Sequence, residues 1–200
     1  MRFSRAKAKI ACPIFDNSGY PYHGFGLKLG DPFALTYKYY PNKKYSFALD
    51  FGKAASGLYS KYYAGLFDTY REDTLQAGES VDYFSHNVKS DIVAELKVVK
   101  NIDATKISNG LVFYFGLGLQ LRSLEIEYSY FPSTGPNDPE KIAATKRSRF
   151  TQGVESVIGI EYSYFSLPVS AFMEIGTFTD VSKDPGWTRI QGGVGLRYIF

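Results

Sequence analysis

The sequence lacks several features that would point to common classes of protein. Its 200 residues contain one cysteine, Cys12, which excludes a disulfide within the chain. Beside that cysteine there are only two histidines, so no cluster of His and Cys ligands for a metal ion is present. The formal net charge is only +3, and composition therefore gives no argument for a nucleic-acid partner. We expect no metal and no other cofactor.

Long apolar runs are also missing. No stretch approaches the roughly eighteen apolar residues of a membrane-spanning helix, although 44% of the residues are hydrophobic. A chain of this kind can cross a membrane only as a closed β-barrel. Met1–Ile10 is basic but no apolar core follows it, which excludes a signal peptide there. We expect residues 1–22 to form a flexible N-terminal segment; a lipid anchor on Cys12 is a weaker alternative.

Aromatic residues and alternating patterns are abundant. There are 17 Tyr and 16 Phe, which suits rings of aromatic side chains at lipid boundaries. The last eleven residues, IQGGVGLRYIF, put apolar side chains on one strand face and small or polar ones on the other. The same alternation predicts eight strands, at about residues 24–30, 33–40, 45–52, 83–100, 110–122, 154–165, 169–180 and 190–200.

Two long connections interrupt the strands, at about residues 53–90 and 122–152. In the first, apolar and aromatic residues recur at spacings of three and four, which predicts a short amphipathic helix. They are Leu58, Tyr59, Tyr62, Tyr63, Leu66, Phe67 and Tyr70. At Arg122–Ser123 the apolar positions change from odd to even numbers. Either a β-bulge or an extra hairpin could cause this, and the bulge is preferred because Arg-Ser is a poor two-residue turn.

The connections also alternate in length. The turns at 41–44, 101–109 and 166–168 are short, as periplasmic turns of outer-membrane barrels are. The predicted fold is all-β, an eight-stranded antiparallel up-and-down transmembrane β-barrel over residues 23–200. With this topology, six aromatic residues fall at the periplasmic rim as a girdle: Tyr39, Tyr45, Phe113, Tyr164, Tyr198 and Phe200.

A family resemblance rests on these segments. GLKLGDPFALTYKYYPNKKYSFALDFG, followed by GLVFYFGLGLQLR, GIEYSYF and GGVGLRYIF, resembles small outer-membrane β-barrel proteins of the Bacteroidetes type, in the porin-like superfamily. The resemblance covers about residues 24–200 and implies a Gram-negative outer membrane with its lipid and lipopolysaccharide as surroundings. It also implies that Phe200 is the terminal aromatic read by the barrel assembly machinery. It implies no particular activity.

Charged residues recur on the face opposite the apolar one. They are Lys28, Lys38, Asp50, Glu95, Lys97, Arg122, Glu161, Glu174, Arg189 and Arg197. Buried charges must be paired, so these residues are expected to form a compensated lumen network. An eight-stranded barrel is just wide enough for side chains to fill, which favours a structural lumen over a gated pore or a proton path.

No catalytic set is apparent, and we expect no enzyme. Some small barrels are lipid A deacylases, so His86, Ser85 and Glu79 were weighed as catalytic residues. Adjacent strand residues face opposite ways, however, so Ser85 is not placed to be activated by His86. The expected function is structural or interactive, with the long loops meeting an unknown extracellular ligand. The alternatives are a narrow passive pore, a lipid A-modifying enzyme, and a soluble barrel, which would have polar outer faces and an apolar lumen.

Overall fold

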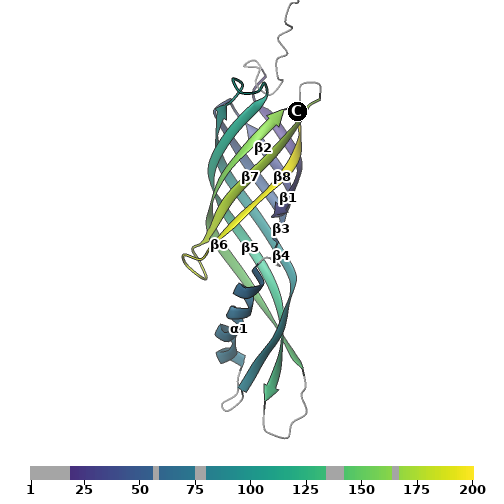
Figure 1. The fold of residues 1–200 in the computed structure, drawn as a ribbon, viewed down its shortest axis with the longest axis vertical. Coiled ribbons are helices and arrows are strands. Elements are labelled where there is room, and N and C mark those ends of the chain that lie inside the picture. Colours follow the sequence, from purple (N-terminus) through teal and green to yellow (C-terminus); the bar gives the residue numbers. More distant parts are fainter. Residues whose placement is uncertain (1–18, 56–58, 75–79, 134–141, 164–166) are drawn as a thin grey trace, which may run out of the picture.

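The computed structural model describes residues 19–55, 59–74, 80–133, 142–163 and 167–200. Its strands are β1 (Tyr22–Asp31), β2 (Phe33–Tyr40), β3 (Tyr45–Lys53), β4 (Ser80–Asp103), β5 (Leu111–Ser133), β6 (Ala143–Ser163), β7 (Val169–Asp180) and β8 (Thr188–Ile199), and its helix is α1 (Ser60–Thr74). Each strand pairs antiparallel with the next, and β8 pairs with β1 to close the barrel (Figure 1). The predicted eight-stranded up-and-down barrel is confirmed. Within the described residues, no helix is long and apolar enough to cross a membrane.

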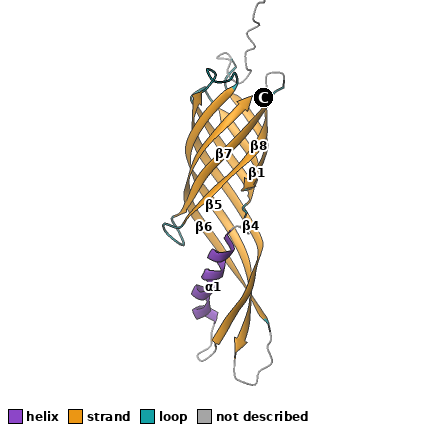
Figure 2. Ribbon diagram, viewed as in Figure 1, coloured by secondary structure: helices purple, strands orange, loops and turns teal. Residues whose placement is uncertain are grey.

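The two ends of the barrel differ. The C-terminus and the turns at 41–44 and 104–110 lie at one end, which we call the turn end (Figure 1). At the opposite end β4, β5 and β6 continue well beyond the other strands (Figure 2). These three strands have 24, 23 and 21 residues, whereas the other five have 8 to 12. We call their continuation, residues 80–91, 123–133 and 143–152, the blade.

Pairing of strands defines where the blade begins. Strand β3 pairs with β4 only as far as Lys53↔Ile92, and β7 pairs with β6 only as far as Asp180↔Gly153. Beyond these positions β4, β5 and β6 pair with one another alone. At about 3.3 Å per residue, residues 123–133 extend the sheet by roughly 35 Å. Helix α1 runs alongside the blade (Figure 2).

Helix α1 follows the predicted spacing and packs its aromatic side against the blade. Tyr63, Leu66 and Phe67 are buried there together with Ile126 and Tyr128 of β5. The amphipathic helix predicted from the sequence is therefore confirmed, and it has 15 residues. Leu58, the first residue of the predicted pattern, lies outside the described residues.

The extents of the predicted loops were partly wrong. Residues 122–133 and 143–152 of the loop predicted at 122–152 are strand. The loop predicted at 53–90 overlaps the strand predicted at about 83–100, and in the structure this part is strand, with β4 beginning at Ser80. In these segments the outward residues are polar. A pattern with apolar outward residues identifies only strands that face lipid, so these strands were predicted as loop. Of the predicted flexible segment 1–22, residues 1–18 lie outside the described residues, and Tyr22 already belongs to β1.

The change of parity at Arg122–Ser123 is neither a bulge nor a hairpin. Strand β5 keeps one register against β6 from Leu111↔Tyr162 to Tyr130↔Ala143. The surroundings change instead. Up to Leu121 the outward side chains are apolar, and beyond it the inward ones, including Leu124 and Ile126, are apolar because α1 covers them. The register shifts lie in β4, at Tyr83/Ser85 and Val88/Ser90, on an edge of the blade.

An apolar belt surrounds the barrel. Its outward residues include Phe25, Leu35, Leu49, Leu96, Leu117, Ile158, Met173 and Leu196, all exposed. On β5 the belt ends at Leu121, because the next outward residues are Ser123 and Glu125. A soluble protein would have to hydrate this continuous apolar surface at great cost, whereas hydrocarbon requires such a face.

Placing an arginine in the belt tests this boundary. Leu117, which is 71% exposed, lies in the middle of the belt segment of β5. We expect Leu117→Arg to lower the free energy of unfolding in lipid bilayers by about 2–4 kcal/mol, and Ser123→Arg, on the same face of the same strand, by about 0–1 kcal/mol. Guanidinium titration of both variants in vesicles measures the difference. Equal losses would place Ser123 in the hydrocarbon and contradict the boundary.

Candidate functional site: the lumen and its covered mouth

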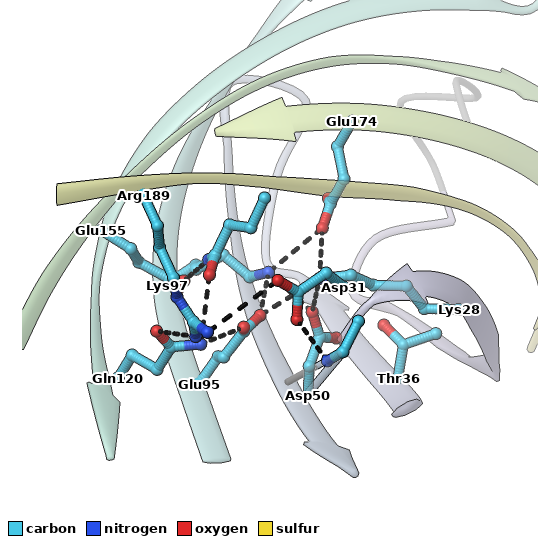
Figure 3. Close-up of polar contacts among 12 residues, drawn as sticks. Lys28, Asp31, Thr36, Asp50, Glu95, Lys97, Gln120, Glu155, Glu174 and Arg189 are labelled. Atoms are coloured by element: carbon cyan, nitrogen blue, oxygen red, sulfur yellow. Dashed lines mark hydrogen bonds and ion pairs between the residues drawn. The ribbon is translucent and has the colours of Figure 1, made fainter. Parts of the chain in front are cut away.

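Two buried lysines and three carboxylates occupy the middle of the lumen (Figure 3). The carboxylates of Asp50, Glu95 and Glu174 lie 3.1, 3.1 and 2.7 Å from Nζ of Lys28. From Nζ of Lys97 the same three distances are 2.6, 2.9 and 3.2 Å. Because both ammonium groups share all three carboxylates, removing any one member leaves several charges without full compensation. We call these five residues the central cluster.

A glycine makes room for this arrangement. Gly118 of β5 faces the lumen beside Lys97, and a Cβ added there would lie 2.6 Å from Oε1 of Glu155 and 2.8 Å from Cγ of Lys97. Residues 97 and 118 are partners in the β4–β5 ladder, so the lysine side chain crosses the space that a side chain at 118 would fill. The small inward residues noted in the sequence thus accommodate long charged side chains.

Glu155 borders the central cluster and was not among the predicted lumen residues. Its Oε2 accepts a hydrogen bond from Gln191 at 3.0 Å, while Oε1 is buried and has no hydrogen-bond partner within the described residues. Gln120 donates to Glu95 at 2.7 Å and accepts from Arg189 at 3.2 Å. Glu155 lies on the same strand face as Glu161, so the alternation in the sequence already indicates that it points inward. The two glutamines carry no charge and gave no comparable signal.

A second cluster, at the turn end, is built around Glu161. Its carboxylate accepts hydrogen bonds from Lys38 at 2.7 Å, from the Tyr40 hydroxyl at 2.6 Å and from Ser170 at 2.7 Å. Arg197 lies 3.5 Å away. With four donors converging on it, Glu161 is the negative centre between two buried cations.

Arg197 links this cluster to the barrel wall. Its Nε and one terminal nitrogen donate to Oγ1 of Thr36 at 3.2 and 3.1 Å, and its guanidinium stacks on the ring of Phe172 at 3.6 Å. Lys38 lies over the ring of Tyr114, with 4.4 Å between Nζ and the ring centroid. Aromatic rings therefore fill the space between the charged side chains and compensate part of the lost hydration.

The mouth at the blade end is covered by the start of α1. Arg122, predicted as a lumen residue, pairs with Asp91 through Nε at 2.6 Å and donates to the Tyr63 hydroxyl at 2.7 Å. Across the mouth, Tyr59 donates to Asp31 at 3.0 Å. Arg189 lies 3.9 Å from Asp31, and its guanidinium is 5.3 Å from the Tyr59 ring. The two tyrosines thus tie the start of the helix to ion pairs at the blade-end mouth of the barrel.

The β7–β8 loop holds the other side of α1. Tyr62 donates to Asp184, and Arg149 of β6 pairs with the same carboxylate at 2.6 Å. Trp187 stacks on Tyr62 with ring centroids 4.1 Å apart. Burial, followed by the hydrogen bond to the negative carboxylate, raises the pKa of Tyr62 well above its usual value. The hydroxyl therefore stays protonated and remains a donor at neutral pH.

Of the three candidate catalytic residues, the two that the structure describes, His86 and Ser85, are not hydrogen-bonded to each other. His86 lies in the blade with Nδ1 2.6 Å from the Tyr83 hydroxyl, and its ring is 6.1 Å from that of Tyr63. Ser85 is the neighbouring strand residue and has no hydrogen bond to His86 among the described contacts, while Glu79 lies outside the described residues. His86 is thus part of the aromatic packing under α1.

This packing predicts a pH response. Burial lowers the pKa of His86 below its ordinary value. The unfolded chain then binds the proton more readily, so the full stability is present above about pH 6.5, the ordinary pKa of histidine, and is lost as the pH falls below that value toward the lower pKa of the folded state. We expect amide protection of α1 to be lower at pH 5.5 than at pH 7 in hydrogen-exchange measurements. In His86→Phe the pH dependence should disappear, and its persistence there would rule out His86 as the cause.

Most of the predicted girdle residues gather at the turn end. Backbone hydrogen bonds of 2.9 Å join His23 and Phe200 in both directions, which extends the β1–β8 ladder to the last residue. The His23 ring lies 5.7 Å from that of Phe200 and 5.1 Å from that of Tyr39. Tyr198 stacks beside Phe200 at 6.2 Å. Tyr45 and Phe113 are exposed at the same end, and Tyr164 lies outside the described residues.

The donor groups of the lumen do not make a metal site. Within the described residues there is no group of three or more His, Cys, Asp and Glu side chains arranged to hold a metal ion. The carboxylates that do converge, in the central cluster, already surround two ammonium groups. What the arrangement can do is hold charge in fixed positions across the barrel and resist its opening.

Comparisons with known proteins support the fold. No protein-family model matches the sequence, and no curated protein matches it. The N-terminal β-barrel domain of OprF from Pseudomonas aeruginosa is similar, with a TM-score of 0.52 and 12% identity, over 90% of this chain and 95% of that one. Ail, the attachment invasion locus protein of Yersinia pestis, gives 0.41 and 11%, over 90% and 95%. CarO2 from Acinetobacter baumannii gives 0.39 and 12%, over 90% and 99%. The chain has the fold of an eight-stranded outer-membrane β-barrel.

Proposed function

We propose that the protein is a non-conducting barrel of a bacterial outer membrane that holds the blade outside the cell as a surface for extracellular partners. The observation that carries this proposal is the division of the molecule into a ring filled with ion pairs and a long, helix-backed extension of three strands. A Bacteroidetes-type origin is part of the proposal and is supported by the sequence segments quoted above.

The orientation is supported by the arrangement of the two ends. In outer-membrane barrels the short turns and both termini are periplasmic. Here the C-terminus and the short turns share the turn end, so the blade would project outward (Figure 1). In this orientation the exposed Tyr198 and Phe200 would meet the inner boundary of the membrane, where the assembly machinery would read Phe200. Lipopolysaccharide and other lipid would surround the belt.

The absence of conduction is supported by the filling of the lumen. Beside the central cluster and beside Glu161 there are two small hollows, each of about 10 Å³. A hollow of this size holds about one water molecule. Tyr59 and Tyr63 cover the mouth above them. A narrow pore would require these paired side chains to move apart in the low dielectric of the lumen.

The composition of the blade surface supports its role as a contact region. On its outer face Lys89 pairs with Glu127 at 2.9 Å and Lys146 with Glu125 at 3.8 Å. Nearer its tip Phe84 is 55% exposed and meets the ring of Phe131 at 5.3 Å. Aromatic residues, Phe among them, are enriched in the cores of protein interfaces, and polar residues form their rims.

Labelling on intact cells tests the proposal. In a Cys12→Ser background, we expect Glu125→Cys in the blade to react with a membrane-impermeant maleimide added outside the cells. Lys43→Cys, in a turn at the turn end, should react only after the outer membrane is permeabilised. Reaction of both residues in intact cells, or of Lys43→Cys alone, would contradict the proposed orientation.

An enzymatic alternative has less support. A lipid A-modifying hydrolase would require a nucleophile beside His86, and the side-chain partner of its Nδ1 is the Tyr83 hydroxyl. Replacing His86 by alanine and analysing the lipid A of the cells would detect such an activity as a changed acylation pattern. We expect no change.

A further inference from the structure

The outside of the barrel has an apolar groove of about 960 Å³ on one side. It is bordered by β6, β7, β8 and the end of β1, within the apolar belt. The side chains that line it include Ile158, Met173, Ile175, Ile190 and Val194. All five are exposed on the outer face. The groove is far larger than the apolar cavities of about 150 Å³ that bind benzene.

Glycines form the floor of the groove. The ladder aligns Ile158 with Ile175, Ile175 with Gly192, and Gly192 with Asp31. At this level β8 has no side chain on its outer face, and β1 ends there. A Cβ at Gly192 would lie 2.5 Å from the carbonyl oxygen of Glu174, and one at Gly30 would lie 2.2 Å from that of Gly192. The neighbouring strands lie so close at these glycines that the backbone itself forms the floor of the groove.

Hydroxyl groups follow the groove on its blade side. Ser156 and Thr177 share a hydrogen bond of 2.9 Å, and Thr179 and Thr188 share one of 3.0 Å. Thr177 and Thr188 are exposed on the outside of the barrel. The surface therefore changes from apolar to hydrogen-bonding along the direction of the strands. A ligand that fits this order has a hydrocarbon end toward the middle of the belt and a polar end toward the blade.

We propose that this groove binds one acyl chain of a lipopolysaccharide molecule, with the carbonyl end of the chain at the hydroxyl groups of Thr177 and Thr188. The inference rests on the proposed outer-membrane location. The groove is continuous with the lipid-facing belt, so its occupant comes from the bilayer and not from water. It lies at the blade end, which is the outer leaflet in the proposed orientation, and the lipid of that leaflet is lipopolysaccharide.

Native mass spectrometry of the detergent-released protein tests the inference, with purified hexa-acyl lipid A as the probe. We expect one lipid A to be retained per barrel. Met173→Trp fills the groove, and should weaken retention about tenfold or more, because a filled groove excludes methylene groups of the chain. Val194→Phe provides a second filling variant. Leu49→Trp, in the belt on β3 at the opposite side of the ring from the groove, is the matched control and should retain lipid A as the wild type does. Heat-dependent mobility in SDS gels checks that each variant is folded.

Three results would overturn the inference. They are no retention by the wild type, equal retention by the groove and control variants, and equal retention of phosphatidylethanolamine with chains of the same length. The last would assign the groove to a phospholipid chain. None of these results changes the labelling pattern expected of Glu125→Cys and Lys43→Cys. The experiments therefore distinguish a failure of the lipid-binding inference from a failure of the proposed outer-membrane location.

Discussion

Replacing Lys97 by methionine is expected to lower the free energy of unfolding by about 3–5 kcal/mol, because it leaves buried carboxylates without compensation. Lys97 is 2% exposed and contacts Asp50, Glu95 and Glu174. Methionine keeps most of the volume of the side chain, so the loss reports charge and not a cavity. Guanidinium titration of the protein refolded into lipid vesicles measures it.

Two further variants isolate the cause. Lys100→Met makes the same substitution three residues along β4, on the exposed outer face, and should change stability by no more than about 0.5 kcal/mol. The double variant Lys97→Met with Asp50→Leu removes one charge of each sign, and should recover part of the loss. The losses of the single variants Lys97→Met and Asp50→Leu are measured separately. If the double variant were less stable than the sum of these two losses predicts, the central cluster would not be held by charge compensation.

Replacing Tyr63 by alanine is expected to weaken the docking of α1 on the blade by about 3–5 kcal/mol. Tyr63 is 1% exposed, packs beside Phe67 and Tyr128, and accepts a hydrogen bond from Arg122. Trp187 is the only tryptophan in the sequence and stacks on Tyr62 of the same helix. Undocking should therefore shift the Trp187 fluorescence to longer wavelength and reduce amide protection in α1.

The matched variant Tyr63→Phe keeps the ring and removes only the hydroxyl. We expect it to cost about 1.5–3 kcal/mol, the value of a hydrogen bond that involves a charged group. In both variants the temperature at which the barrel loses its fast mobility in SDS gels should stay close to that of the wild type, since the ring and the helix-backed blade are separate packing units. A large fall in that temperature for Tyr63→Ala would mean that α1 holds the ring together.

The strand pattern of the ring was predictable because one physical rule governs it. Wherever lipid faces one side of a strand, as along Phe33–Tyr40 and Val169–Asp180, the apolar residues keep one parity, and both predicted ranges agree with the structure. The blade breaks that rule. From Leu124 onward the apolar face turns inward to meet α1. The apolar residues therefore change to the opposite parity, which on the sequence alone predicts a bulge followed by a loop.

The candidate site was only partly predictable for a related reason. The alternation of inward residues predicts ten charged lumen residues. Eight of them belong to the two lumen clusters, and a ninth, Arg189, lies beside Asp31. The tenth, Arg122, lies at the mouth beside Tyr63. Which residues share a partner depends on the closure of β8 on β1 and on the stagger between strands, and a single strand does not encode either.

The most direct test of the account is conductance in planar lipid bilayers. Folding of the protein should be verified on the same sample by its heat-dependent mobility in SDS gels, and its insertion by flotation with lipid vesicles. The filled lumen predicts that bilayers containing the folded protein stay at baseline current, at both signs of the applied voltage and in concentrated salt. Stable ohmic steps from the folded protein would contradict the account, because ions can cross only if the side chains around Lys28 and Lys97 leave an open path.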